Sequence, residues 1–210
     1  METNRIAVIG GTGKSGAYLV DRLVENQFKL RVLVRDPKRI RAHPSIEILV
    51  GDARNYDSIA RLIIGCDSII STLGQPRGES SIFSEATRNV VQAMNETGID
   101  RYIVTTGLSV NTPFDKKEPR VQLATDWMYQ NFPETTKDKQ VEYDFLSVSE
   151  VRWTMVRLPL IVESHERFPT QVNLENCHGE RIISSDLADF LVNQLLDTTY
   201  IQKCPFLYNV

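Results

Sequence analysis

The chain has 210 residues, of which 41% are hydrophobic and 24% are charged, and its formal net charge is −3. This length suits a single domain, residues 1–210, and the slightly acidic balance argues against a general nucleic-acid binder. No apolar stretch approaches the roughly 20 residues that a membrane span requires, and the three cysteines lack metal-ligand spacing. We therefore expect a cytoplasmic protein with no metal site and no membrane or nucleic-acid partner.

The amino-terminal part of the sequence is typical of a strand, a glycine-rich turn and a helix. The apolar residues 6–9 come first, the glycines of residues 10–16 follow, and residues 17–24 have a helical pattern. This order directs several backbone N–H groups and the positive end of a helix toward one point, where a phosphate binds well. The segment therefore predicts a site for a phosphorylated small molecule.

Two kinds of phosphate-binding turn compete for this segment. A nucleoside triphosphate loop, Gly-x-x-x-x-Gly-Lys-Ser/Thr, requires a glycine where Val8 stands inside the strand, so it is excluded. A dinucleotide loop fits instead. Gly10 would form the tight turn, Gly13 would let the backbone approach a pyrophosphate, and Gly16 would let the helix pack on the strand. The spacing Gly-x-x-Gly-x-x-Gly is a variant, which needs independent support.

The end of the second strand provides that support. Residues 28–34 form an apolar strand, and in a dinucleotide-binding fold its end lies beside the adenosine ribose. An acid there accepts from a free 2′-hydroxyl, whereas an arginine favours a 2′-phosphate. Arg35 holds the position and Arg39 follows one turn later, so NADP(H) is preferred, while the adjacent Asp36 keeps NAD(H) possible. The alternative interpretation of the basic run at 29–41 is an ordinary solvated face.

Strands and helices then alternate along the chain. Further strands are expected at residues 46–50, 68–74, 101–105 and 152–158, and helices at 57–64, 81–97, 121–132, 137–150 and 186–196. Asp57 and Ser185 are the expected N-caps of two of these helices. Continuous apolar strands between helices predict an α/β fold, a Rossmann-type doubly wound parallel sheet with helices on both faces. A small irregular lobe is expected at about 160–180, where it would cover the substrate, and an edge strand at about 206–208.

Several segments of the chain match one family. They are Ile-Gly-Gly-Thr-Gly-Lys-Ser-Gly at 9–16, Val-Leu-Val-Arg-Asp at 32–36, Gly-Asp-Ala at 51–53, Gly-Cys-Asp-Ser-Ile-Ile-Ser-Thr-Leu-Gly at 65–74, Trp-Thr-Met-Val-Arg-Leu-Pro at 153–159 and Ile-Ser-Ser-Asp-Leu-Ala at 183–188. With these segments the chain resembles the atypical short-chain dehydrogenase/reductases, in particular the biliverdin reductase B and flavin reductase group and the related NmrA-like proteins. The resemblance covers nearly the whole chain and is more specific for the fold and cofactor than for the substrate.

The resemblance implies a set of cofactor-binding residues. The pyrophosphate would be held by Gly10, Thr12, Gly13, Lys14, Ser15 and Gly16, the 2′-phosphate by Arg35 and Arg39, and the adenine by Asp52 and Ala53. The ribose and nicotinamide would lie beside Leu73 and Gly74, with Thr105, Thr106, Gly107 and Lys139 along the far side and Pro159 at the start of a covering loop.

The catalytic residues depart from the common pattern of short-chain dehydrogenases. Those enzymes use Tyr-x-x-x-Lys, in which the lysine lowers the pKa of the tyrosine. Lys139 matches the lysine, but Thr135 stands in the tyrosine position. Ser109 is a candidate to orient the substrate, the alternative being a loop serine bonded to its own backbone. His165 and His178 are candidate proton donors in the expected lobe.

An aromatic platform for a flat ring is a further possibility. Its side chains would be Trp127, Met128, Phe132 and Phe168. The alternative is that these four residues belong to the hydrophobic core.

We expect an NADPH-dependent reductase that transfers hydride to a flat conjugated acceptor, such as a flavin, quinone or tetrapyrrole. The alternatives are a non-catalytic NADP-binding sensor of the NmrA-like type and an NAD(P)-dependent epimerase or isomerase, which the missing tyrosine weakens. The partner would be the small-molecule acceptor, and either a monomer or a homodimer fits.

Overall fold

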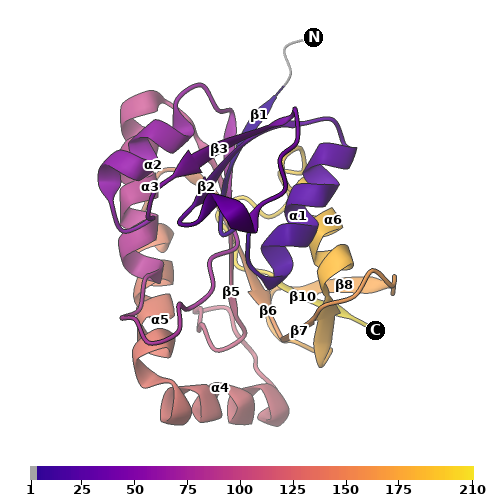
Figure 1. Cartoon of the computed structure of the whole chain (residues 1–210). Coiled ribbons are helices and arrows are strands. Elements are labelled where there is room, and N and C mark those ends of the chain that lie inside the picture. Colours follow the sequence, from indigo (N-terminus) through magenta and orange to yellow (C-terminus); the bar gives the residue numbers. More distant parts are fainter. Residues whose placement is uncertain (1–3) are drawn as a thin grey trace.

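A computed structural model describes residues 4–210 and contains one central sheet of eight strands in the order β3-β2-β1-β4-β5-β6-β10-β8 (Figure 1). The strands are β1 (Arg5–Ile9), β2 (Lys29–Val34), β3 (Ile46–Val50), β4 (Ser68–Ser71), β5 (Arg101–Gly107), β6 (Arg152–Leu158), β8 (Thr170–Asn173) and β10 (Phe206–Asn209). All neighbours pair in parallel except β8, which is antiparallel to β10. Two short strands, β7 (Leu160–Val162) and β9 (Arg181–Ile183), pair with each other in a second sheet.

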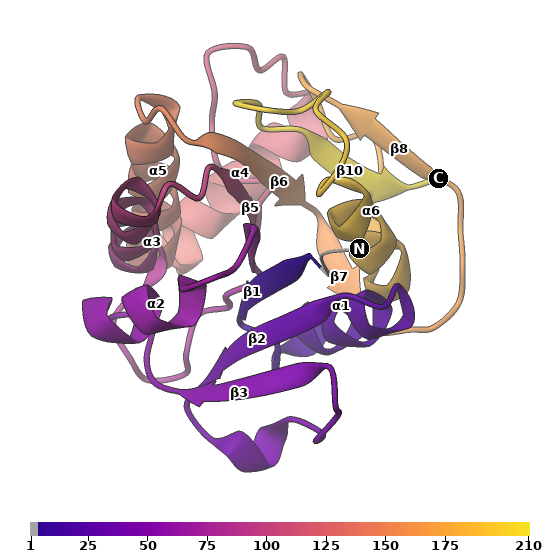
Figure 2. The ribbon, with the colours of Figure 1, turned by 90° about the horizontal axis from the view of Figure 1, so that it is seen from above.

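Helices cover both faces of the central sheet. They are α1 (Lys14–Glu25), α2 (Tyr56–Ile63), α3 (Phe83–Thr97), α4 (Pro119–Asn131), α5 (Pro133–Ser147) and α6 (Ser184–Asn193). Figure 2 shows α1 and α6 packed together on one face, and α2, α3 and α5 on the other. The reversal of strand order between β1 and β4 is the point at which the carboxyl ends of the strands open into a crevice. The expected doubly wound α/β fold is therefore confirmed.

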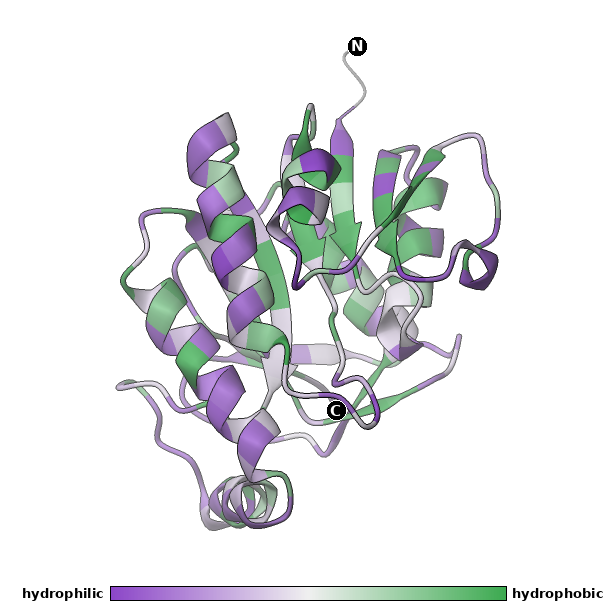
Figure 3. Ribbon diagram, turned by 60° about the vertical axis from the view of Figure 1, so that its left-hand side comes forward, coloured by the Kyte–Doolittle hydropathy of each residue, from purple (hydrophilic) through white to green (hydrophobic). Residues whose placement is uncertain are grey.

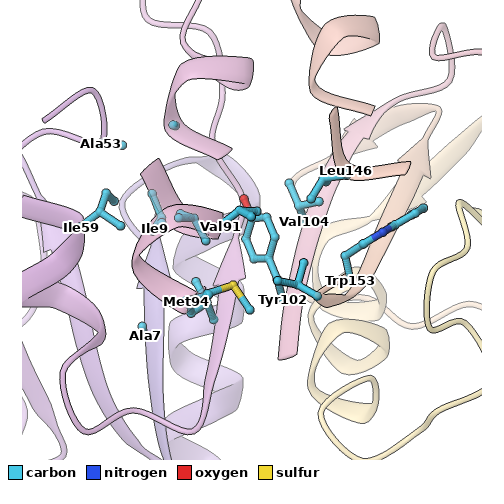
Figure 4. Close-up of a cluster of buried hydrophobic side chains, with 14 of the residues drawn as sticks. Ala7, Ile9, Ala53, Ile59, Val91, Met94, Tyr102, Val104, Leu146 and Trp153 are labelled. Carbon is cyan, nitrogen blue, oxygen red and sulfur yellow. The ribbon is translucent and has the colours of Figure 1, made fainter. Parts of the chain in front are cut away.

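The hydrophobic core lies in two layers because alternate residues of each strand point to opposite faces. On one face Ala7, Tyr102 and Trp153 pack with α2, α3 and α5, as the close-up of Figure 4 shows. On the other face Val8 and Ile103 pack against α1 and α6. The strands are accordingly hydrophobic along most of their length, whereas the helices alternate hydrophobic and hydrophilic residues (Figure 3). Burial of both faces explains why the strands are continuous apolar runs.

Two expected helix caps are wrong. Asn55, not Asp57, caps α2, and its side chain accepts a hydrogen bond from the Ser58 N–H at 2.9 Å. Asp57 lies in the first helical turn, where a carboxylate interacts favourably with the positive helix end. The N-cap position of α6 is Ile183, whose side chain makes no capping bond. Ser185 is the second residue of the helix, and its hydroxyl donates to the carbonyl of Glu166 at 2.7 Å.

The carboxyl-terminal third is more regular than the sequence suggests. The expected irregular lobe at 160–180 contains β7 and β8, and β8 forms the outer edge of the central sheet. The expected edge strand near 206–208 is β10, which lies inside the sheet between β6 and β8. Its four residues are all buried, in keeping with an interior position.

Candidate functional site

The glycine turn between β1 and α1 is shaped by contacts that leave no room for side chains. Gly10 has φ +80°, and a Cβ atom added to it would lie 2.7 Å from the Thr72 carbonyl. A Cβ atom on Gly16 would lie 2.0 Å from the carbonyl oxygen of Gly10, so Gly16 lets α1 begin against the turn itself rather than against the strand. At Gly13 a Cβ atom would meet only that same oxygen, at 3.3 Å. The turn is open at Gly13, the position at which we expect a pyrophosphate to approach.

The start of α1 offers donors to an anion. Gly13 is its N-cap and supplies no side chain, and the first turn contains no acidic residue. The first N–H groups of a helix have no partners within the helix, and together with the helix dipole they favour a phosphate. Lys14 is exposed beside them and adds a positive charge.

A cleft of about 1040 Å³ lies along this turn and the carboxyl ends of the strands. Ten residues expected to bind the cofactor line it, namely Gly10, Thr12, Gly13, Lys14, Arg35, Arg39, Asp52, Ala53, Leu73 and Gly74. Ser15 and Gly16 are buried behind the turn. The extended arrangement of these residues, from the helix amino end to the ends of β2 and β4, fits a dinucleotide.

The expected adenosine end of this cleft contains both arginines and acidic residues. Arg35 lies just beyond β2, and its Nη1 donates to Oε1 of Glu79 at 2.6 Å, a hydrogen bond that raises the pKa of Arg35. Arg39 donates to the carbonyl of Thr12 at 3.4 Å. Asp36 caps a short 3-10 helix by accepting from the Lys38 N–H at 2.9 Å. The carboxylate of Asp36 is thus bound to the backbone of its own turn, whereas the guanidinium of Arg35 binds a side chain.

Two expected catalytic residues meet at the carboxyl end of β5. A Cβ atom placed on Gly107 would lie 3.6 Å from Oγ of Ser109 and 3.7 Å from Nζ of Lys139, so both groups converge on the same point. The Ser109 side chain is 1% exposed, and its Oγ has no hydrogen-bond partner among residues 4–210. Oγ1 of Thr106 is also buried without a partner within that range. Buried hydroxyls without a partner are costly, so both groups keep free hydrogen-bonding capacity.

The cofactor cleft and the end of β5 lie at the same edge of the sheet. Of the residues expected at the site, however, Thr105, Thr106, Gly107, Ser109, Lys139 and Pro159 are not among those that line the cleft. Ser71 of β4 pairs with Val104 of β5, and Gly107 pairs with Leu158 of β6. The residues that follow each strand, Gly74 on one side and Pro159 on the other, therefore leave the sheet at the same edge. Thr105 contributes to this junction by donating to the Ser71 carbonyl at 3.5 Å.

The electrostatic surroundings of Lys139 suit proton transfer. Its Nζ lies 4.6 Å from the centre of the Phe83 ring, and burial lowers the pKa of its ammonium group, an effect that Glu142 opposes. Glu142 is itself buried one turn along α5, where burial raises the pKa of its carboxyl to about 7. Its Oε1 accepts from the hydroxyl of Thr87 at 2.6 Å, which lies 3.1 Å from the hydroxyl of Tyr102. Behind Lys139 there is thus a second buried titratable group.

The histidines lie in other parts of the structure. His165 is exposed and stacks on Tyr18 with ring centroids 4.7 Å apart, in a separate cleft lined by residues of α1 and α6. His178 is exposed and lies 3.4 Å from a carboxylate oxygen of Glu118. Neither is among the residues that surround Gly107 within 4 Å.

The expected aromatic platform is not assembled as one surface. Trp127 and Phe132 pack edge to face at 5.6 Å and are 54% and 51% exposed, so they are not core residues. Phe168 lies under the guanidinium of Arg181 instead.

Three residues of the cleft belong to no motif that predicts their individual contacts. Glu79 contacts Arg35, and Glu163 lies 3.4 Å from Nζ of Lys14. Gln75 lines the same cleft and binds the carbonyls of its own loop. For Gln75 and Glu79 the sequence does give a signal: they belong to the polar segment 75–80 after β4, and a loop at the carboxyl end of a strand is where ligands bind in this fold. Glu163, which follows β7, has no such signal.

Within residues 4–210 there is no cluster of three or more histidine, cysteine or acidic side chains that could hold a metal ion. No helix in that range is both long and apolar enough to cross a membrane.

Sequence relatives cover part of the chain. A 3-beta-hydroxysteroid dehydrogenase of Mycolicibacterium neoaurum is 32% identical over 122 residues, which are 52% of this chain and 33% of that protein. An isoflavone reductase homologue, A622-like, of Nicotiana tabacum is 28% identical over 113 residues, 49% of this chain and 34% of that protein. The chain thus spans about a third of the length of the curated relatives it matches.

Solved structures match the fold over almost the whole chain. The anaerobillin reductase ChuY of Escherichia coli O157:H7 aligns with a TM-score of 0.80 at 20% identity and covers 98% of this chain and 97% of its own. A short-chain dehydrogenase/reductase of Veillonella parvula, solved in complex with NADP, aligns with a TM-score of 0.80 at 14% identity over 98% and 94% of the two chains. The family model described as NAD(P)H-binding matches residues 10–198. The chain therefore belongs to the NAD(P)H-binding family.

Proposed function

We propose that this protein is an NADPH-dependent reductase that transfers hydride to a flat conjugated acceptor, such as a flavin, quinone or tetrapyrrole. The observation that carries the proposal is the pair at the end of β5, where the unpartnered hydroxyl of Ser109 and the ammonium of Lys139 converge at the edge of the sheet along which the cleft lies. When bound, the cofactor supplies the hydride, and that chemistry needs mainly positioning from the protein.

The residues of the cleft fit such a cofactor. The open side of the turn at Gly13 and the first N–H groups of α1 would hold the pyrophosphate, and Arg35 with Arg39 would hold the 2′-phosphate. Leu73 and Gly74 would lie along the ribose and nicotinamide.

The polar groups near Gly107 would act on the acceptor. The Ser109 hydroxyl has free hydrogen-bonding capacity and would orient a carbonyl or ring nitrogen of the acceptor. The ammonium of Lys139, whose pKa burial lowers, would deliver a proton to that atom directly or through the hydroxyl. Thr135 precedes Lys139 by four residues, so no phenol stands ready for the reversible oxidation of an alcohol. This favours reduction of a conjugated ring over dehydrogenase or epimerase chemistry.

The test is NADPH oxidation followed at constant cofactor concentration with FMN, a benzoquinone and biliverdin as acceptors. We expect turnover with at least one acceptor and a loss of turnover in Ser109→Ala. Tight NADPH binding without turnover on any of the three would contradict the proposal and favour a cofactor-sensing protein.

A further inference from the structure

The carboxylate of Glu79 bridges two arginines at the expected adenosine end of the cofactor cleft. Oε1 of Glu79 lies 2.6 Å from Nη1 of Arg35, and Oε2 lies 3.0 Å from Nη1 of Arg54. The two guanidinium groups come from the ends of different strands, β2 and β3, and Glu79 joins them from the loop after β4. This bridge stands where the position of Arg35 predicts the 2′-phosphate of NADP(H).

The loop that carries Glu79 is held in this arrangement by its own contacts. The side-chain amide of Gln75 donates to the carbonyls of Pro76 at 3.1 Å and Glu79 at 2.9 Å. Nη2 of Arg54 donates to the carbonyl of Ser80 at 2.7 Å. Both ends of the loop are thereby fixed around Glu79, which makes the bridge more than a chance pairing of surface side chains.

Arg35 and Arg54 differ in the number of acidic neighbours that each would keep if Glu79 were removed. Arg54 also lies 3.8 Å from Asp52 and 3.9 Å from Glu85, so it keeps two acidic neighbours. Among the residues that the structure describes, Glu79 is the carboxylate with which Arg35 forms an ion pair. Loss of Glu79 therefore frees Arg35, while Arg54 stays where it is.

A phosphate and a carboxylate compete for the same guanidinium. Both accept two parallel N–H bonds from the planar arginine fork, but a phosphate monoester carries more charge and a third acceptor oxygen. The ribose of NADH has a neutral hydroxyl at this position, which has no comparable attraction for Arg35.

We propose that Glu79 determines cofactor choice by occupying Arg35 as an internal competitor of the 2′-phosphate. NADPH must displace the carboxylate, whereas NADH leaves it in place. Glu79 thus lowers the preference for NADPH that Arg35 alone would give. This inference rests on the proposed use of NADPH by the same cleft and adds the residue that tunes it.

The test compares Glu79→Gln and Glu79→Ala with wild type by titrating NADPH and NADH, using the quenching of tryptophan fluorescence to obtain Kd. Two exposed ion pairs are lost, so we expect NADPH to bind about three- to tenfold more tightly, with NADH changed less than about twofold. Glu85→Gln is the matched control. It removes the same charge beside Arg54 but leaves the pair with Arg35, so the ratio of the two Kd values should stay at the wild-type value.

Two results would overturn the inference. In one, NADPH and NADH change by the same factor or not at all. In the other, the Glu79 variants lose affinity for NADH, which would make Glu79 an acceptor for the ribose 2′-hydroxyl. Turnover with the acceptors is measured separately on the same proteins. Tighter NADPH binding with NADH binding unchanged, but without any turnover, would contradict the proposed reductase and support this role of Glu79. Turnover with an unchanged Kd for NADPH would do the reverse.

Discussion

The carboxylate of Glu163 lies 3.4 Å from the ammonium of Lys14, so the segment after β7 is joined to the first residue of α1 across the cofactor cleft. Both side chains are at least half exposed. Because Lys14 stands beside the expected pyrophosphate position, Glu163 should compete with a group that NADPH and NADH share.

Glu163→Gln is therefore expected to tighten the binding of both cofactors by the same factor, about two- to fivefold, with the gain reduced at high salt. The measurement is a pair of titrations at low and high ionic strength. An effect on NADPH alone would show that Glu163 acts elsewhere than at the pyrophosphate.

Arg35→Ala tests the 2′-phosphate position. Hydrogen bonds between charged groups are stronger than neutral ones, so the affinity for NADPH should fall about ten- to hundredfold while that for NADH changes little. Arg41→Ala is the control, because Arg41 belongs to the same basic run but does not line this cleft. Equal losses for both cofactors in Arg35→Ala would mean that Arg35 does not bind the 2′-phosphate.

Gly16→Ala tests the closed side of the turn. Alanine normally stabilises a helix relative to glycine, but here its Cβ atom would lie 2.0 Å from the Gly10 carbonyl oxygen. We expect a loss of about 1–3 kcal/mol in the free energy of unfolding, as for an overpacked site. Gly13→Ala, whose Cβ atom would lie 3.3 Å from the same oxygen, should lose less. Urea denaturation measures both, and a Gly16→Ala variant as stable as wild type would contradict the contact.

Ser109→Ala separates function from structure at one residue. A buried hydroxyl without a partner does not stabilise the fold, so its removal should leave the free energy of unfolding unchanged or raise it slightly. Turnover should fall at least about tenfold, because the group that orients the acceptor is lost. A clear loss of stability would instead support the alternative of a serine that bonds to its own loop.

Glu142→Gln tests the buried carboxyl behind Lys139. Burial raises the pKa of Glu142 from 4.5 to about 7, so the folded protein holds this proton more tightly than the unfolded chain does. The protonated carboxyl therefore contributes to the free energy of unfolding, and this contribution is fully present below pH 4.5 and is lost as pH rises toward 7. Glutamine mimics the protonated acid and keeps a hydrogen bond to Thr87.

The free energy of unfolding of Glu142→Gln should therefore rise relative to that of wild type as pH increases, by up to about 3 kcal/mol above pH 7. Denaturation series at pH 5 and 7.5 provide the comparison. Other titratable groups that act on Glu142 are Asp138 and Lys139, and both are retained in the variant. A difference between the two proteins that does not depend on pH would rule out Glu142 as the titrating group.

The strands were predictable from their apolar runs. Residues 46–50 and 152–158 match β3 and β6 residue for residue, because prolines, glycines and charges lie on either side of these runs. Strand β6 is buried along most of its length, whereas β3 is the outer strand and its Glu47 and Val50 are exposed. The interior position of β10 was not predictable. The three apolar residues 206–208 indicate a strand but do not say whether a further strand, β8, will pair with its open side.

The candidate site likewise contains some residues that the sequence predicts and others whose contacts depend on the fold. The glycine turn and Arg35 have fixed spacings along the chain, so the sequence alone points to them. Ser109 and Lys139 were expected singly, but their meeting at Gly107 depends on the packing of α5 against the end of β5. Glu79 had no signal of its own, because its contact with Arg35 depends on how one loop is folded.

The position of β10 between β6 and β8 has a consequence for the order in which the protein is assembled during synthesis. Strands β1 to β6 can pair with one another as they leave the ribosome, since each finds its neighbours among segments made earlier or soon after. The open edge of β6, however, waits for the last strand in chain order, and β8 has no place in the sheet before that strand arrives. A nascent chain thus exposes the unpaired edge of β6 until β10 has been made, and such an edge is a template for aggregation.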